Sequence, residues 1–201
     1  MISLAFHATL MALVVGRLVS ELRRMSRHDG LTGLLNRRAM EEALDAQARR
    51  SRRNREPFVV MMLDLDHFKA VNDRHGHAVG DQALKQVSAV LRAGVREVDR
   101  IARFGGAEFL VLLPGATLAA ALPLAERLRE QTAAQPLLHA GARVEFSVSI
   151  GIAEWLGAQE DLSRLLQRAD AALYQAEHQG RNRVEQAASA AAVGQGAPAL
   201  S

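Results

Sequence analysis

The stretch "RFGGAEFLVLLP", residues 103 to 114, places two adjacent glycines between two apolar runs. Glycine adopts positive φ angles without steric cost, so this pattern predicts a tight β-hairpin around Gly105 and Gly106. The arms would be "RIARF", residues 100–104, and "EFLVLLP", residues 108–114. Glu108 comes directly after the turn, where a carboxylate is well placed to meet a ligand. Ala107 is either an ordinary turn residue or the replacement of a lost acid.

A second strand is predicted upstream, at "PFVVMMLDLD", residues 57–66. A continuous apolar run is typical of a central strand that is buried on both faces. Asp64 and Asp66 end this run, and ligands of α/β proteins gather at the carboxyl ends of strands. Carboxylates suit hard cations such as Mg²⁺, which accompany nucleotide phosphates. The alternative is that Asp66 caps the next helix and Asp64 is merely solvated.

The segment "DLDHFKAVNDRHGHAVGD", residues 64–81, brings further polar groups into a predicted turn after this strand. Lys69 can serve a phosphate. An asparagine such as Asn72 offers both a donor and an acceptor, and a carboxylate such as Asp81 can accept from guanine N1–H and N2–H₂. The "HGH" at residues 75–77 is a weak metal signal because no third ligand is evident, and a turn is favoured there.

The remaining elements follow from periodicity and turn residues. Helices are predicted at about 37–55, 78–93, 117–134 and 161–179, and a strand at 144–155. The order is helix, strand, helix, hairpin, helix, strand, helix. This order predicts an α/β fold in which helices pack on a mixed sheet.

The two ends of the chain differ from this domain in composition. Residues 1–19 are almost wholly apolar, and we expect an N-terminal membrane-spanning helix there; a buried amphipathic helix or a dimerising coil is the alternative. Residues 20–28 read as a charged helical connector. Its arginines favour the inner (cytoplasmic) membrane with the rest of the chain in the cytoplasm, or a soluble cytoplasmic protein if the helix does not insert. The low-complexity residues 186–201 are predicted to be a disordered tail.

Composition excludes some functions. The chain has no cysteine, which rules out disulfides and thiolate metal sites. Its sequence pI is about 10.1, but the formal net charge is only +3 and aromatic residues make up 4%. Basic residues are interspersed with acids, and no aromatic stacking platform is visible, so nucleic acid is not an expected partner.

Four motifs together resemble the GGDEF domain, the family of bacterial diguanylate cyclases. They are "DGLTGLLNRRAM" (29–40), "DLDHFKAVNDRHGHAVGD" (64–81), "REVDRIARFGGAEF" (96–109) and "ADAALYQAEHQGRN" (169–182). The resemblance covers about residues 27–185, and we assign residues 29–185 to this domain. It implies a palm-like mixed central sheet flanked by helices, and a homodimer that joins two GTP into cyclic di-GMP and two pyrophosphates. It also implies Mg²⁺ or Mn²⁺ as cofactor, clamping the reacting oxygens.

The resemblance assigns roles residue by residue. Asp64 and Glu108 would be catalytic and, with the Leu65 carbonyl, would bind the metal. Asn72 and Asp81 would hold guanine, and His77 would line the nucleotide pocket. Lys69 and Arg181 would bind phosphate. Arg96 and Asp99 would bind cyclic di-GMP at an inhibitory site, for which the alternative is a solvated salt bridge. Gly105 and Gly106 would form the signature turn.

Two departures from the family pattern point to weak or impaired turnover. Ala107 stands where the signature has an acid that binds metal and is a candidate for activating the 3′-hydroxyl. Glu177 stands where a lysine is usual, and its charge opposes phosphate binding. Glu177 is also spaced to pair with Arg181. The alternative function is a degenerate domain that binds cyclic di-GMP or GTP as a regulatory module; a purely structural role in dimerisation is the least favoured.

Overall fold

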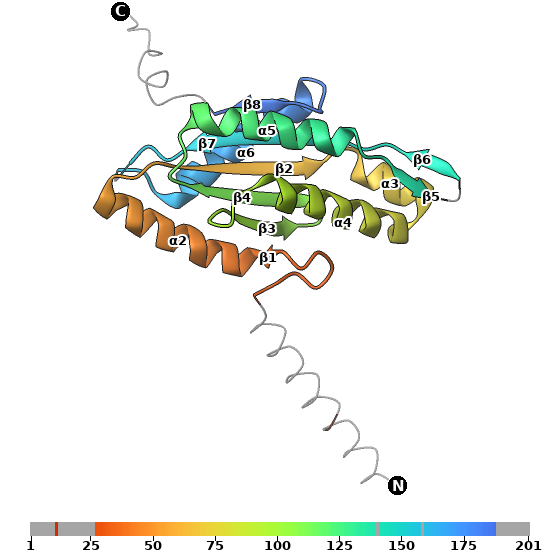
Figure 1. Cartoon of the computed structure of the whole chain (residues 1–201), viewed down its shortest axis with the longest axis horizontal. Helices are drawn as coiled ribbons and strands as arrows, with labels where there is room; N and C mark the ends of the chain where they lie inside the picture. The colour runs from red at the N-terminus through yellow and green to blue at the C-terminus, as the bar shows by residue number, and fades with distance from the viewer. Residues whose placement is uncertain (1–10, 12–26, 140, 158, 188–201) are drawn as a thin grey trace, which may run out of the picture.

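The computed structural model describes residues 11, 27–139, 141–157 and 159–187, and Figure 1 shows their arrangement. The predicted apolar helix at residues 1–19 and most of the connector at residues 20–28 lie outside the described residues. So does the chain from residue 188 onward. Within the described part, no helix is both long enough and apolar enough to cross a membrane.

The centre of the domain is a six-stranded mixed sheet, as predicted. Its order is β1-β3-β4-β2-β7-β8. The central strand β2 runs antiparallel to both of its neighbours, β4 and β7, while the outer pairs β1–β3 and β7–β8 are parallel. The bounds are β1 (Leu35–Asn36), β2 (Phe58–Leu65), β3 (Arg100–Gly105), β4 (Glu108–Pro114), β7 (Val148–Glu154) and β8 (Val184–Gln186).

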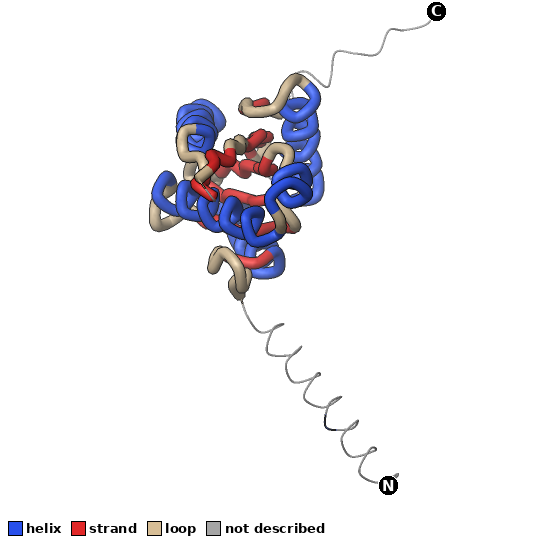
Figure 2. Tube along the Cα trace, turned by 90° about the vertical axis from the view of Figure 1, so that its right-hand side faces the viewer, coloured by secondary structure: helices blue, strands red, loops and turns tan. Residues whose placement is uncertain are grey.

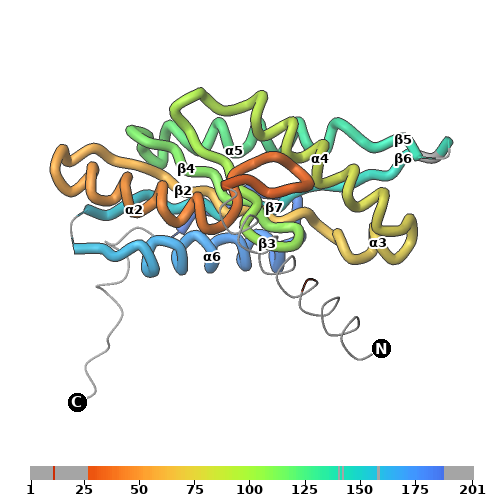
Figure 3. The backbone as a smooth tube through the Cα atoms, turned by 90° about the horizontal axis from the view of Figure 1, so that it is seen from below, coloured from red at the N-terminus to blue at the C-terminus, as the bar shows by residue number. Residues whose placement is uncertain are grey.

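Helices cover both faces of this sheet (Figure 2). α2 (Arg37–Asn54) and α6 (Leu162–His178) pack on one face, where they lie side by side in Figure 3. α4 (His77–Gly94) and α5 (Leu118–Ala133) pack on the other. The short helix α3 (Phe68–His75) connects β2 to α4.

The central position of β2 explains its unbroken apolar sequence. Successive side chains of a strand point to opposite faces. Val59, Met61 and Leu63 therefore join the core under α4 and α5, whereas Val60 and Met62 join the core under α2 and α6. The prediction of a buried central strand is confirmed.

Gly151 in β7 sets how closely α6 can approach the sheet. A β-carbon at this position would collide with the helix backbone at Ala169 and Leu173. The absence of a side chain thus lets α6 rest directly on β7. This contact fixes the helix that carries Glu177 relative to the strands that carry the acids.

Three local predictions were wrong. The segment after β2 is not a turn, because α3 and α4 follow each other there and break only at Gly76, whose φ is 84°. The predicted strand at 144–155 is shorter: β7 begins at Val148, and β6 (Ala142–Val144) pairs instead with β5 (Leu137–His139). The third error is at Gln186, which lies in β8 opposite Ile152 rather than in the tail. β8 is short and polar, and it exists because β7 offers a partner.

Candidate functional site

Two predicted acids face each other at one end of the sheet. Asp64 in β2 and Glu108 in β4 are register partners, so their side chains emerge on the same face. The Leu65 amide donates to the Ala107 carbonyl at 3.3 Å, which holds the β3–β4 turn against the end of β2. The structure therefore brings Asp64, Leu65 and Glu108 together.

The hairpin turn is centred one residue later than predicted. Gly105 is the last residue of β3 and pairs with Glu108, so Gly106 and Ala107 form the turn itself. The register shifts between Arg103 and Gly105, which marks a β-bulge. A β-carbon at Gly105 would stand 3.1 Å from Glu108 Oε2, so glycine leaves room for that carboxylate. Arg103 donates to the Gly106 carbonyl at 2.7 and 3.0 Å.

Asp64 sits among like charges. Burial, and then the neighbouring carboxylates of Glu177, Glu108 and Asp66, raise its pKa to about 7, while Arg181 opposes this shift. The C-terminal end of α6 therefore contributes to the same site. No hydrogen bond or ion pair joins Glu177 to Arg181 in the described residues, so the predicted pairing between them is not present. Ala107 is half-buried and packs against the core under α4 and α5.

Few protein side chains at this site could bind a metal ion. Across the described ranges, no group of three or more histidine and acidic side chains is arranged to hold a metal ion. His75 ends α3 and His77 begins α4, so the two histidines lie on either side of the helix break at Gly76. Mg²⁺ usually binds through one or two protein carboxylates, with water and substrate phosphates completing its shell. Asp64 and Glu108 fit that requirement when a nucleotide is present.

A buried amide marks the predicted guanine pocket. Asn72 lies on α3 and leans against Gly80 of α4, next to the ring of Phe68. Its Oδ1 is buried and has no hydrogen-bond partner. Asp81 is the residue after Gly80 and is exposed, as are His77 at the start of α4 and Lys69 on α3. An unpaired buried oxygen is costly, so this position is available to accept a hydrogen bond from a ligand.

Asp66 does not cap the following helix, so that alternative was wrong. The helix begins after His67, whose side chain makes no capping bond. Asp66 is 5% exposed. Its carboxylate accepts from Ser147 Oγ at 2.5 Å, from Ser149 Oγ at 2.7 Å and from the Asn182 amide at 3.1 Å. These three partners could not be recognised from the sequence, since they lie more than 80 positions away along the chain.

Arg96 and Asp99 form a tight pair at the other end of the hairpin. Arg96 NH2 donates to Asp99 Oδ1 at 2.8 Å and to the Pro114 carbonyl at 3.2 Å. The Asp99 side chain is fully buried, while that of Arg96 is 60% exposed. The hydrogen bond to Asp99 raises the pKa of Arg96. The seven residues of β4 separate this pair from Glu108, a span of roughly 20 Å.

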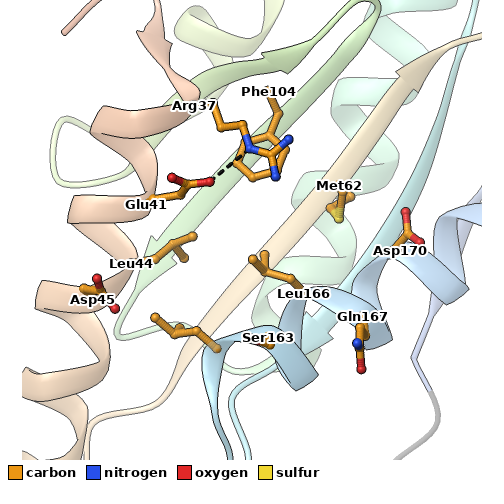
Figure 4. Close-up of a pocket in the computed structure, with 11 residues that line it drawn as sticks. Arg37, Glu41, Leu44, Asp45, Met62, Phe104, Ser163, Leu166, Gln167 and Asp170 are labelled. Carbon is orange, nitrogen blue, oxygen red and sulfur yellow. Dashed lines mark hydrogen bonds and ion pairs between the residues drawn. The ribbon is translucent and has the colours of Figure 1, made fainter. Parts of the chain in front are cut away.

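The structure also contains an open groove of about 540 Å³ between α2 and α6 (Figure 4). Its floor includes Met62, two residues before Asp64. At one end, Arg37 stacks over the Phe104 ring at 4.6 Å and pairs with Glu41 at 2.9 Å. None of the predicted site residues lines this groove.

Comparisons with known proteins agree on one kind of domain. The sequence profile described as "Diguanylate cyclase, GGDEF domain" matches residues 26–183. The chain is 41% identical to diguanylate cyclase DgcP of Pseudomonas aeruginosa, over 90% of this chain and 26% of that protein. It is 39% identical to response regulator PleD of Caulobacter vibrioides, over 78% of this chain and 35% of that protein. The chain thus spans about a quarter to a third of these relatives.

A solved structure matches along nearly its whole length. The coiled coil and GGDEF domain of DgcB from Caulobacter crescentus, in complex with c-di-GMP, superimposes with a TM-score of 0.77 at 31% identity. The match covers 90% of this chain and 96% of that one. The central sheet and its flanking helices are therefore the architecture of that domain.

Proposed function

This chain belongs to the GGDEF family of diguanylate cyclases, and from that premise we propose that it joins two GTP into cyclic di-GMP with a low turnover. The observation that carries this proposal is the buried, unpartnered Oδ1 of Asn72. In the proposed complex this oxygen accepts from guanine, while Asp81 accepts from the neighbouring guanine donors. Lys69 and Arg181 neutralise the triphosphate.

The reaction is a transfer between two nucleotides held by two protomers. The 3′-hydroxyl of one GTP attacks the α-phosphorus of the other; the bond from that phosphorus to the β-phosphate oxygen breaks, and pyrophosphate leaves. A second, symmetrical transfer closes the ring. Glu108 and Asp64 would be the carboxylates available to accept the hydroxyl proton. A divalent cation held by these acids and the Leu65 carbonyl would supply charge neutralisation at the phosphates.

Ala107 and Glu177 set the expected limits of this activity. Ala107 has no oxygen to ligate a cation or accept a proton, so the site works with one acid fewer on the turn. Glu177 adds negative charge where phosphates would bind, and it already raises the pKa of Asp64. Both changes weaken interactions with the transition state, and we therefore expect a lower kcat more than a higher KM.

A second function, regulated binding without turnover, is favoured by the Arg96–Asp99 geometry. The buried Asp99 accepts from Nε and NH2 of Arg96, which orients the guanidinium, and 60% of the Arg96 side chain is exposed. A planar guanidinium suits bidentate contacts with phosphate. This surface is intact despite the two losses at the catalytic end, so binding of cyclic di-GMP does not depend on turnover.

The test is nucleotide turnover by the purified chain with GTP and either Mg²⁺ or Mn²⁺, with products separated by chromatography. Cyclic di-GMP that disappears in the Asp64→Ala variant supports the cyclase. Cyclic di-GMP binding without product would instead support the regulatory module. Failure to bind either nucleotide would overturn both. Insertion of residues 1–19 into a membrane and assembly into a homodimer remain separate predictions.

A further inference from the structure

The loop that carries Arg181 has an unfavourable backbone. Arg181 and Asn182 follow α6 with φ angles of 61° and 45°, so two consecutive non-glycine residues adopt the left-handed conformation. Each such residue costs on the order of 1 kcal/mol, and asparagine tolerates the conformation better than arginine. Contacts from the rest of the domain have to maintain this loop.

Two side chains that are distant in the sequence form hydrogen bonds with Asn182. The Asp66 carboxylate accepts from its backbone amide at 3.1 Å, and Arg129 of α5 donates to its Oδ1 at 2.9 Å. On the other side of the loop, the Arg181 amide donates to the Ala176 carbonyl at 3.0 Å. These bonds fix the backbone on both sides of the Arg181 side chain.

The Asp66 carboxylate is itself oriented by the sheet. Ser147 and Ser149 donate to its two oxygens, and the Asp66 amide donates to the Ser147 carbonyl at 2.9 Å. Asp66 comes two residues after Asp64 on the same strand end. One buried carboxylate therefore ties the strand that carries Asp64 to the loop that carries Arg181.

We propose that Asp66 is a positioning residue: it holds Asn182, and through it directs Arg181 toward the phosphates of the nucleotide. Ser147 and Ser149 keep the carboxylate aimed at the loop. This inference rests on the proposed function, because it assumes that Arg181 contacts phosphate. It assigns Asp66 a role that acts through Asn182, to which its carboxylate is hydrogen-bonded.

The experiment measures affinity for GTP and for guanosine by competition with a fluorescent guanine nucleotide, using the whole chain. Guanosine has the base but no phosphate. Asp66→Ala is expected to weaken GTP binding about tenfold, the effect of roughly one charged hydrogen bond, and to leave guanosine binding unchanged. Combined with Arg181→Ala, Asp66→Ala is expected to cause no additional loss.

Milder and matched variants keep this test decisive if Asp66→Ala does not fold. Asp66→Asn retains a carbonyl for the Asn182 amide and can donate to Ser149, so GTP affinity should recover to within about threefold of the parent. Glu160→Ala is the control, because Glu160 is also a buried carboxylate, accepting from the Leu156 amide and Arg168 at the opposite end of the sheet. It should lower the melting temperature without changing GTP affinity.

Other outcomes would overturn the inference. Losses from Asp66→Ala and Arg181→Ala that multiply in the double variant would show that the two residues act independently. Equal weakening of GTP and guanosine would show general damage to the domain. If Arg181→Ala leaves GTP affinity unchanged, the phosphate role in the proposed function fails as well. Loss of GTP binding in Arg181→Ala but not in Asp66→Ala would refute only the positioning role.

Discussion

The side-chain amide of Asn72 occupies the space that a β-carbon at Gly80 would fill. Gly80 lies in the first turn of α4, where alanine would be the better helix former. Gly80 thus weakens the helix in which it lies, but it leaves the room that the Asn72 amide occupies. In the proposed nucleotide complex, the pair would link the packing of α3 on α4 to the binding of the base.

Gly80→Ala is therefore expected to separate stability from binding. The alanine methyl displaces the Asn72 amide, which is the end of a flexible side chain. The free energy of unfolding should therefore change by less than about 1 kcal/mol. GTP affinity should fall about tenfold, as in Asn72→Ala, because the acceptor for guanine has moved. Denaturant unfolding and nucleotide titration measure the two quantities. Unchanged GTP affinity would remove Asn72 from the pocket.

Ala107→Asp is expected to raise turnover about tenfold by restoring an acid to the turn, and adding Glu177→Lys should raise it further. Initial rates of cyclic di-GMP formation measure this. Ala107→Asn is the matched control, since it has nearly the same volume but no charge. A double variant no faster than the parent would contradict our account of both departures.

Arg96→Ala is expected to weaken cyclic di-GMP binding at least tenfold, because it removes the exposed guanidinium that Asp99 orients. Isothermal titration with cyclic di-GMP measures the loss. Arg50 provides the control: it is similarly exposed and pairs with Glu56 at 3.0 Å. Arg50→Ala should bind like the parent, and an equal effect from both variants would argue against a specific site.

The charge at Asp64 predicts a pH-dependent stability. Its pKa rises from 3.8 to about 7 on folding, so the folded state holds a proton that the unfolded state has lost between these values. Stability should therefore fall as pH rises from 4 to 7 and then level off. With a metal chelator present, Asp64→Asn should be more stable than the parent at pH 8 by about 1–2 kcal/mol, a figure that allows for solvent screening. At pH 3 the variant should be no more stable than the parent. Urea unfolding at both pH values tests this, and a gain independent of pH would refute it.

Gly151→Ala is expected to destabilise the domain by more than about 3 kcal/mol, because the added methyl meets helix backbone that cannot rotate away. Gly30→Ala is the control, since nothing lies within 4 Å of the added carbon. Thermal unfolding compares them. Similar melting temperatures for the two variants would show that α6 can shift.

The sequence was most informative where one strand or helix carries its own pattern. The apolar run before Asp64 and the glycines of the hairpin predicted the central strands. That Glu108 lies opposite Asp64 is known only from the strand register, although the family resemblance implied that both bind the metal. Long-range pairing was not predictable: nothing near Asp66 in the sequence indicates Ser147, Ser149 or Asn182 as partners. α3 lacks a capping signal at its start, and β8 is recognisable only once β7 is in place.

The backbone contact between α6 and Gly151 has a mechanical consequence. Since helix and strand touch without intervening side chains, we expect Glu177 and the loop that follows to keep their position relative to the sheet. In the proposed homodimer, each protomer would then present its part of the site as a rigid body. Control over catalysis would come from the distance between the two protomers, rather than from a hinge inside one of them.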